Sequence, residues 1–323
     1  MCTAISQNVS DHYFGRNLDY EHTFGETITV TPRRYPFYFR NGWELKEHYA
    51  MIGMAVVSRG YPLYFDATNE KGLSMAGLNF PEMACYKKTV SGKDNIASFE
   101  LIPWILGQCA SVVEAEELLQ RINITDEAFS EEFPPSPLHF ILADSEKSIT
   151  LEQTSQGLFV CENSVGVLTN NPTFDMHMFY LSNFLSVSSQ EPTNRFSDKI
   201  DLWLYSRGMG GIGLPGDLSS ASRFVRACFT KLNSVFGETE EEIISQFFHV
   251  LSSVFQTKGC ACVGEGYEMT NYSSCCNTTR GIYYYKTYYN SHIYGIDMHK
   301  ENLEGYLPVS YEPLKFEKIT IQN

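Results

Sequence analysis

The sequence predicts an α+β protein whose sheets are largely antiparallel. The chain of 323 residues is 43% hydrophobic and 14% aromatic, which is enough to bury a sizeable core. Apolar residues alternate with polar ones in some segments, as in half-buried strands, and recur at helical spacing in others. The two patterns come in blocks, which favours antiparallel sheets with helical layers over a parallel, doubly wound sheet.

Strands are expected to dominate the N-terminal quarter of the chain. Alternation indicates strands at 2–6 and 27–30, and two apolar runs follow at 51–57 and 73–80, with 61–66 between these two runs. The polar sequence from Asn69 to Gly72 precedes the last of them and predicts a tight turn. We therefore expect hairpins in this region.

Two consecutive helices are expected next, and strands after them. Helical spacing runs over 98–109 and again from Ser111, an N-cap residue, through Ile122. Strand patterns then resume in four segments, at 138–143, 148–152, 158–160 and 165–168. We expect these four strands to form a second sheet.

The last part of the chain is predicted to be mainly helical before it returns to strands. Helical patterns occupy three segments, at 174–184, 219–235 and 239–255. Thr239 and Glu242 form a capping box at the start of the last one. Strand patterns follow at 283–289 and 292–296. Because no linker separates two self-sufficient halves, we expect one domain covering residues 1–323.

The charge of the chain disfavours several classes of partner. Subtracting 38 Asp and Glu from 24 Lys and Arg gives −14, which repels nucleic-acid phosphates and anionic membranes, so we expect neither partner. Apolar stretches such as 101–106 are far shorter than the roughly 18 residues that span a bilayer. The first residues lack the pattern of a secretory signal, and nine Cys is an odd number. We expect reduced thiols and a cytoplasmic location.

Two motif matches lack the context that their chemistry requires. Residues 208–213 match G-x-G-x-x-G, but no helix signal follows where a dinucleotide-binding helix would begin. The pairs Cys260/Cys262 and Cys275/Cys276 depart from the spacing of zinc-binding knuckles. We therefore expect neither a nicotinamide cofactor nor a metal site.

Cys2 is the most informative residue of the chain. Removal of Met1 would leave a first residue that carries both a thiol and an α-amine, with ordinary pKa values of about 8.5 and 7.7–8.0. The amine can then accept the thiol proton, so nucleophile and base share one residue. A buried small residue at the start of a strand would explain Cys2 equally well by itself. A hairpin would, however, bring Arg16 and Asp19 beside it, where Arg16 would favour the thiolate and Asp19 would hold the ammonium.

Six blocks of sequence, in order along the chain, resemble the choloylglycine hydrolases, which are N-terminal-nucleophile amidases that include conjugated bile acid hydrolases and penicillin V acylases. The resemblance runs essentially end to end. The blocks are 1–3 (Met-Cys-Thr), 15–19 (Gly-Arg-Asn-Leu-Asp), 69–73 (Asn-Glu-Lys-Gly-Leu), 77–80 (Gly-Leu-Asn-Phe), 168–172 (Leu-Thr-Asn-Asn-Pro) and 213–217 (Gly-Leu-Pro-Gly-Asp) leading to 222–224 (Ser-Arg-Phe).

The resemblance implies a four-layer αββα sandwich and an acyl-transfer mechanism that needs no cofactor or metal. Cys2 then corresponds to the nucleophile and base, with Arg16 and Asp19 as its polarising partners. Arg223 is expected to organise the carboxylate. Asn79 and Asn170 resemble the oxyanion-hole residues, which fits the capacity of an Asn amide to donate to a developing oxyanion. Asn171 is adjacent, so the alignment of the motif decides between the two.

The residue at position 79 indicates the substrate class. Asn in this block resembles the bile acid hydrolases, whereas penicillin V acylases more often have an aromatic there, so a glycine- or taurine-conjugated bile acid is expected. Leu18, Phe129 and Phe133 are candidates for an apolar wall against the steroid. Arg16 or Arg207 would supply local attraction for the anionic end. Family members are commonly tetramers, so we also expect a homotetramer, with an exposed hairpin extension as the contact.

Two other functions remain open at this level. One is a penicillin V acylase or another N-acyl amidase with the same machinery. The other is a non-catalytic, thiol-rich binding protein in which Cys2 only packs.

Overall fold

Two antiparallel sheets form the centre of the molecule in the computed structural model, which describes residues 1–323. The first sheet has six strands, in the order β14 (Val167–Leu168), β1 (Cys2–Asn8), β2 (His12–Tyr20), β17 (Met269–Asn277), β18 (Ile282–Thr287) and β19 (Asn290–Asp297). The second has eight, in the order β13 (Gly157–Glu162), β12 (Ser148–Thr154), β11 (Leu138–Ala143), β8 (Ser74–Asn79), β7 (Tyr61–Asn69), β6 (Met51–Ser58), β3 (Thr27–Thr31) and β20 (Val309–Tyr311).

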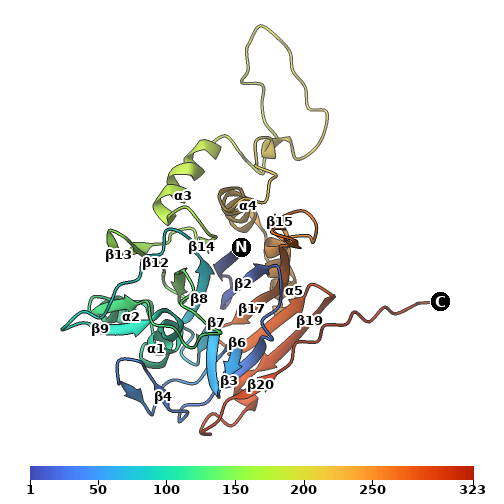
Figure 1. Cartoon of the computed structure of the whole chain (residues 1–323). Helices are drawn as coiled ribbons and strands as arrows, with labels where there is room; N and C mark the ends of the chain where they lie inside the picture. Colours follow the sequence, from blue (N-terminus) through green and yellow to red (C-terminus); the bar gives the residue numbers. More distant parts are fainter.

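Helices cover the outer face of each sheet, which gives four layers in the order helix, sheet, sheet, helix (Figure 1). α1 (Leu101–Gln108) and α2 (Val112–Leu119) pack on the eight-stranded sheet. α4 (Ser220–Asn233) and α5 (Glu240–Ser252) pack on the six-stranded one, and α3 (Phe174–Leu181) lies against α4. The α+β class, the antiparallel sheets and the αββα sandwich are thus confirmed.

The remaining elements are short. There are three two-stranded ladders, formed by β4 (Phe37–Tyr38) with β5 (Glu44–Leu45), β9 (Asp94–Ala97) with β10 (Ile122–Thr125), and β15 (Cys262–Val263) with β16 (Gly266–Tyr267). Four 3₁₀ turns are η1 (Ser98–Glu100), η2 (Ser182–Phe184), η3 (Met209–Gly211) and η4 (Met298–Lys300).

The central strands of the eight-stranded sheet, such as β6 and β8, are buried on both faces, which explains their continuous apolar runs. Along β8, Met75 packs beneath α1 and α2, whereas Ala76 and Leu78 face the six-stranded sheet. Polar links also cross between the sheets. The Asp66 carboxylate on β7 accepts hydrogen bonds from the hydroxyls of Tyr272 and Tyr283, each at 2.7 Å. These two hydrogen bonds join the eight-stranded sheet to the six-stranded sheet through the core between them.

Two sequence-based expectations about the middle of the chain were wrong. The helix that begins after Ser111 ends at Leu119, because Ile122 already belongs to β10, which pairs in parallel with β9. The strands at 138–162 do not start a second sheet. β11 pairs with β8, with Leu138 opposite Asn79, so these strands extend the sheet that β6, β7 and β8 begin. Only β14 joins the other sheet, beside β1.

β17 was not predicted, because its sequence is polar. All of its residues are nevertheless buried, since β2 and β18 flank it and α5 covers it. Its polar side chains find partners there: the hydroxyls of Thr270 and Ser273 donate to Asp19 and Asn17 on β2, at 2.6 and 2.7 Å. Internal hydrogen bonds thus replace the usual apolar pattern.

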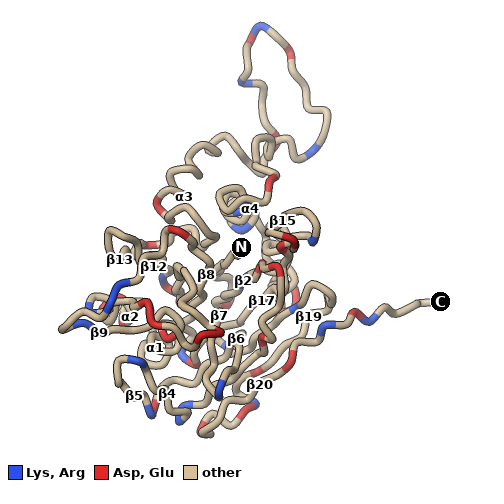
Figure 2. The backbone as a smooth tube through the Cα atoms, viewed as in Figure 1, with Lys and Arg blue, Asp and Glu red and all other residues tan.

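One long segment leaves the body of the molecule between α3 and α4, shown in gold at the top of Figure 1. Exposed apolar side chains crowd it, and Phe196, Trp203 and Tyr205 are 82%, 80% and 78% exposed. Basic and acidic residues are both present along it and are scattered over the other elements as well (Figure 2). None of the helices has the length and apolar character needed to cross a bilayer.

Candidate active site

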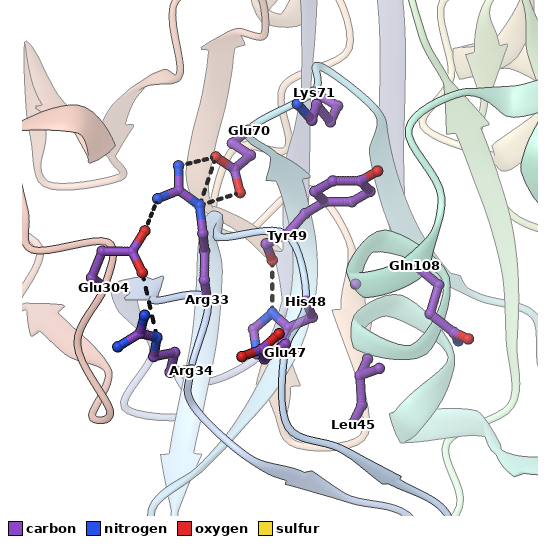
Figure 3. Close-up of a pocket in the computed structure, with 11 residues that line it drawn as sticks. Arg33, Arg34, Leu45, Glu47, His48, Tyr49, Glu70, Lys71, Gln108 and Glu304 are labelled. Carbon is purple, nitrogen blue, oxygen red and sulfur yellow. Dashed lines mark hydrogen bonds and ion pairs between the residues drawn. The ribbon is translucent and has the colours of Figure 1, made fainter.

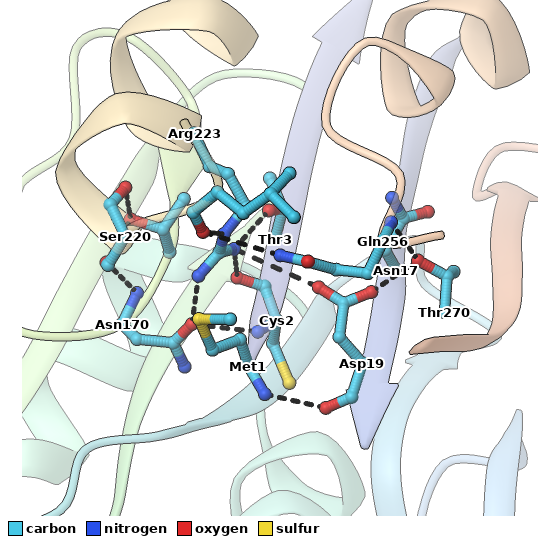
Figure 4. A network of polar contacts seen from close by, with 12 residues as sticks. Met1, Cys2, Thr3, Asn17, Asp19, Asn170, Ser220, Arg223, Gln256 and Thr270 are labelled. Atoms are coloured by element: carbon cyan, nitrogen blue, oxygen red, sulfur yellow. Dashed lines mark hydrogen bonds and ion pairs between the residues drawn. The ribbon is translucent and has the colours of Figure 1, made fainter. Parts of the chain in front are cut away.

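Cys2 lies at the start of β1, directly opposite Leu18 on β2, and is almost completely buried. Its backbone N–H donates to Asn170 Oδ1 at 2.8 Å, and its carbonyl accepts from Arg223 Nη1 at 2.5 Å. Figure 4 shows both contacts. They come from distant parts of the chain and fix the backbone that carries the thiol.

Arg223 is the centre of the polar network around Cys2. The first turns of α4 place its guanidinium against β1, with no exposure to solvent. Besides Cys2, its partners are the Leu218 carbonyl (3.0 Å), Thr3 Oγ1 (2.8 Å), Asn170 Oδ1 (2.7 Å) and, at ion-pair distance, Asp19 Oδ2 (3.9 Å). Burial lowers the pKa of Arg223, whereas Asp19 opposes the shift. The guanidinium is thus shared between a carboxylate and a neutral amide.

The structure brings Asp19 to the N-terminus, as the hairpin predicted, but by a different contact. The Met1 amine donates to the Asp19 backbone carbonyl at 2.7 Å. The Asp19 carboxylate instead accepts from Thr270 at 2.6 Å and pairs with Arg223, and burial raises the pKa of this carboxyl. The carboxylate that contacts the Met1 amine belongs to Glu268, which the sequence analysis missed.

Arg16 joins the two sheets behind the thiol. It lies on β2, and its Nη1 donates to the carbonyls of Phe65 and Gly77, at 3.0 and 2.6 Å, on β7 and β8. Its Nη2 has no partner although it is buried. Burial acts to lower the pKa of Arg16, but Cys2 and neighbouring acidic groups raise it on balance. A buried N–H without a partner beside a thiol is a donor available to a ligand or a thiolate.

The structure places Asn170 in contact with both Cys2 and the Asn79 backbone, whereas Asn171 has a different partner. Asn170 Nδ2 donates to the Asn79 carbonyl at 2.7 Å, while its Oδ1 faces Cys2 and Arg223. Asn171 instead donates to the Pro81 carbonyl at 2.6 Å. The geometry therefore favours Asn170 over Asn171 as the amide that contacts Cys2.

Two buried histidines, which the sequence analysis did not single out, hold the segment that carries Asn170. The His139 ring lies 2.9 Å from the Thr169 carbonyl, and His177 Nε2 lies 2.8 Å from the next carbonyl, that of Asn170. Burial lowers the pKa of His177 to about 4, so its ring is neutral near pH 7 and donates through Nε2. Ser220 Oγ accepts from the Asn170 N–H at 2.8 Å.

The predicted wall residues are not all beside the thiol. Leu18 packs in the core opposite Cys2. Phe129 and Phe133 form part of a half-buried aromatic cluster in which Phe129 lies 5.3 Å from Phe99 and 5.6 Å from Tyr61, between ring centroids. Their loop precedes β11, whose first residue pairs with the end of β8. The cluster therefore stands at the end of the sheet where Asn79 lies.

A second aromatic cluster follows directly after β2. The rings of Tyr20 and Phe24 have centroids 4.8 Å apart, and Phe24 lies 5.6 Å from Phe65, whose carbonyl accepts from Arg16. The signal in the sequence is the run of aromatic residues immediately after Asp19. Arg207, in contrast, is exposed on the protruding segment and forms no side-chain hydrogen bond or ion pair. The structure does not bring it to Cys2 within one chain.

A polar groove elsewhere on the molecule has a cavity volume of about 610 Å³ (Figure 3). The charges along it neutralise one another: Arg33 pairs with Glu70 and Glu304, and Arg34 Nε lies 3.5 Å from Glu304. None of the residues that line this groove belongs to the network around Cys2.

The cysteines are all unpaired and do not converge. Cys260 and Cys262 are exposed on the β15 hairpin, whereas Cys275 and Cys276 are buried in β17. No group of three or more His, Cys, Asp or Glu side chains is close enough to hold a metal ion.

A four-layer αββα sandwich with a cysteine at the start of a central strand defines the class of N-terminal-nucleophile hydrolases. Residues 2–311 match the family of linear amide C–N hydrolases, choloylglycine hydrolase family. The chain belongs to this family, which confirms the identification from the six sequence blocks.

Several relatives match almost the whole chain. A bile salt hydrolase/transferase of Lactiplantibacillus plantarum is 53% identical, with 98% of each chain covered. A bile salt hydrolase/transferase of Clostridium perfringens is 40% identical, with 94% of each covered. The crystal structure of a mutant conjugated bile acid hydrolase from Clostridium perfringens has a TM-score of 0.91 at 38% identity and covers 100% of both chains. A penicillin V acylase from Agrobacterium tumefaciens, 20% identical, shares the fold with a TM-score of 0.78 over 96% of this chain and 91% of its own.

Proposed function

We propose that this protein is a bile salt hydrolase that cleaves the amide bond of glycine- or taurine-conjugated bile acids, with Cys2 as its nucleophile. The observation that carries the proposal is the Cys2 site within a chain 53% identical, end to end, to a bile salt hydrolase/transferase. In this proposal, residues 1–323 form a single catalytic domain, and Met1 is removed to free the Cys2 amine.

Acylation begins with transfer of the thiol proton to the α-amine of Cys2. The sulfur attacks the amide carbon, and the oxygen of the tetrahedral intermediate accepts hydrogen bonds from the side-chain amides of Asn79 and Asn170. The C–N bond then breaks, and the ammonium of Cys2 passes its proton to the departing glycine or taurine nitrogen. Asn170 suits this role because its Oδ1 is held by Arg223, which turns its NH₂ group toward Asn79.

The charged residues keep Cys2 and its amine in place. Arg223 holds the Cys2 carbonyl and pairs with the Asp19 carboxylate, so neither buried charge stands alone. Arg16 presents an unpaired Nη2 near the thiol and stabilises the thiolate. Water then attacks the thioester carbon while the α-amine takes its proton. The C–S bond breaks, the α-ammonium passes this proton to the sulfur, and the bile acid leaves the free thiol.

The steroid is held by apolar side chains on either side of the site. The cluster of Tyr20, Phe24 and Phe65 adjoins the strand that carries Asp19, and Phe129 and Phe133 stand at the Asn79 end of the other sheet. Leu18 is buried in the core opposite Cys2, so in this proposal it supports the strand of Cys2 rather than the steroid.

The enzyme is a homotetramer in this proposal, and the protruding segment is its contact. Phe196, Trp203 and Tyr205 are almost fully exposed on it, and such side chains usually mark a protein interface. Arg207 lies on the same segment and is exposed, without a contact to the network around Cys2 in its own chain, so we propose that it attracts the anionic end of the substrate at the site of another copy. Nine unpaired cysteines fit a reducing compartment, so we place the enzyme in the cytoplasm.

A thioester can also pass its acyl group to an amine, and relatives carry the name hydrolase/transferase. We therefore propose acyl transfer to amines as a second reaction of the same Cys2 intermediate.

The proposal is tested by intact mass and by release of glycine and taurine from conjugated bile acids, with penicillin V as a competing substrate. The protein is expected to lack Met1 and to prefer bile conjugates, and Cys2→Ala is expected to release nothing. Cys85→Ala removes an exposed thiol as the matched control and should keep full activity. If penicillin V is cleaved faster than the bile conjugates, the substrate assigned to the enzyme would change to penicillin V, and the mechanism would stand. Equal activity of Cys2→Ala would refute the mechanism.

A further inference from the structure

We propose that the space between the Asp19 carbonyl and the Glu268 carboxylate is a binding site for a primary ammonium group. In the processed enzyme this site takes the amino group of an acyl acceptor. The inference rests on the proposed function, because the acceptor reacts with the thioester on Cys2.

An ammonium group occupies this place in the unprocessed chain. The Met1 amine donates to the Asp19 carbonyl at 2.7 Å and forms an ion pair with the Glu268 carboxylate. One oxygen is a backbone carbonyl on β2, which is fixed by its strand, and the other follows the β15–β16 hairpin. A carbonyl and a carboxylate that converge on one nitrogen suit an ammonium group, which has three donors and no acceptor.

Glu268 has no other task in the structure. Its side chain is 7% exposed, and its carboxylate has no polar partner except the Met1 amine. It takes no part in the proposed hydrolytic steps. Once Met1 is removed, the Glu268 carboxylate loses its one ion-pair partner, and a buried carboxylate is costly unless a cation pairs with it. The site is thus prepared for another ammonium group.

The position of this site suits attack on the thioester. Met1 directly precedes Cys2 in the chain, so the Met1 amine lies within one residue of the nucleophile. Figure 4 shows this amine together with the Cys2 thiol and the Asp19 carbonyl. The electrostatic effect of Cys2 on the pKa of the Met1 amine, which it raises against the lowering effect of burial, also indicates that thiol and amine are near each other. An acceptor nitrogen held here stands beside the acylated sulfur.

The reaction at this site is aminolysis of the thioester. The bound ammonium gives one proton to the free α-amine of Cys2, and its nitrogen lone pair forms a bond to the thioester carbon. The C–S bond then breaks with its electron pair on sulfur, which takes the second proton from the acceptor nitrogen. The products are the new amide and the Cys2 thiol, and the proton on the α-amine returns to solvent.

The charge of Glu268 predicts which amines are preferred. It attracts the ammonium of any primary amine, but it repels an acceptor that carries a carboxylate next to its amino group. Glycinamide and glycine differ in this respect and are nearly equal in size. We therefore expect Glu268 to favour glycinamide over glycine.

The test is a competition between these two acceptors for one thioester. Processed enzyme receives a taurine-conjugated bile acid as donor and equal concentrations of glycinamide and glycine, and the initial rates of the two new amides are compared. Their ratio depends neither on the hydrolysis rate nor on the amount of thioester. Glu268→Gln is expected to lower the ratio of glycinamide to glycine product about tenfold, because both acceptors lose the ion pair with their ammonium but only glycine is freed from a repulsion of its carboxylate.

Glu265→Gln is the matched control, since it removes the same charge from an exposed position of the same hairpin and should leave the ratio unchanged. Glu268→Asp keeps the charge and should retain a preference for glycinamide. Its ratio of glycinamide to glycine product is expected to lie between the ratio of the Glu265→Gln control and about one tenth of that ratio. This variant replaces Glu268→Gln if the latter does not fold. An equal ratio in the Glu265 and Glu268 variants would overturn the acceptor site and leave hydrolysis standing. Activity that survives Cys2→Ala would overturn the proposed function itself.

Discussion

Two adjacent asparagines allow a direct test of the site geometry. Asn170 Oδ1 accepts from Cys2 and Arg223, and its Nδ2 lies in the proposed oxyanion hole, whereas Asn171 only donates to the Pro81 carbonyl. The change Asn170→Ala should therefore impair catalysis far more than Asn171→Ala, although both remove the same chemical group from neighbouring residues.

The expected magnitudes follow from the contacts that each change removes. Loss of one oxyanion donor typically costs about 10²–10³ in kcat, or about 2.7–4 kcal/mol of transition-state stabilisation. Asn170→Ala also leaves the buried Cys2 N–H and one Arg223 N–H without their acceptor, which costs about 1–3 kcal/mol of folding stability for each group. Asn171→Ala loses one hydrogen bond, worth about 1 kcal/mol, and no proposed catalytic contact.

The assay measures kcat and KM for glycine release together with the free energy of unfolding in urea. A kcat for Asn170→Ala within tenfold of wild type would contradict the assignment, provided that the variant is folded. So would equal losses of kcat in the two variants, because the geometry distinguishes them sharply.

Arg223→Lys keeps the charge, but a lysine cannot reach all of the partners of Arg223 at once, so kcat should fall by about 10² or more. Because the charge opposite Asp19 is retained, the variant should stay folded, and its kcat and melting temperature are measured side by side. The pKa of His177 is lowered to about 4 from an ordinary 6.5, so between these pH values the unfolded chain binds one proton more than the folded chain. The free energy of unfolding should therefore fall with decreasing pH across this range, by up to about 3 kcal/mol. His177→Asn should reduce the slope of the free energy of unfolding against pH by the equivalent of about one proton. A Cβ on Gly15 would overlap the backbone of β17, so Gly15→Ala should cost more than about 3 kcal/mol of stability, whereas Gly216→Ala, with open space around it, should cost under about 1 kcal/mol in the same urea titration. Trp203→Ser removes an exposed aromatic side chain from the protruding segment and should shift the native mass toward smaller species at low protein concentration, and an unchanged mass would remove this segment from the assembly contact.

Local signals in the sequence were sufficient wherever the structure is decided by neighbouring residues. The Thr239–Glu242 capping box starts α5, and Ser111 caps α2 by accepting from the Glu114 N–H. The runs at 51–57 and 73–80 form strands because their apolar side chains fill both faces of a buried sheet. The nucleophile candidate required more than its position next to Met1, since only the nearby Arg16 and Asp19 and the six ordered blocks distinguished Cys2 from a packing residue.

Other features depend on contacts between residues far apart in the chain. β17 is a strand only because β2, β18 and α5 surround it and supply partners for its hydroxyls. Strand patterns at 138–162 gave no information about which sheet they would join, because pairing with β8 is decided by the whole sheet.

The sequence by itself determined the family and the class of fold, because these are encoded in local patterns and in six ordered blocks. It also pointed to Asp19, Asn170 and Arg223, which the structure places in one polar network with Cys2. Only the tertiary structure decided that Asn170 rather than Asn171 contacts Cys2, that Asp19 meets the Met1 amine through its carbonyl, and that the Glu268 carboxylate pairs with that amine. The physical reason is that a hydrogen bond depends on the direction of each group, and groups separated by hundreds of residues acquire a direction relative to one another only when both sheets are packed together.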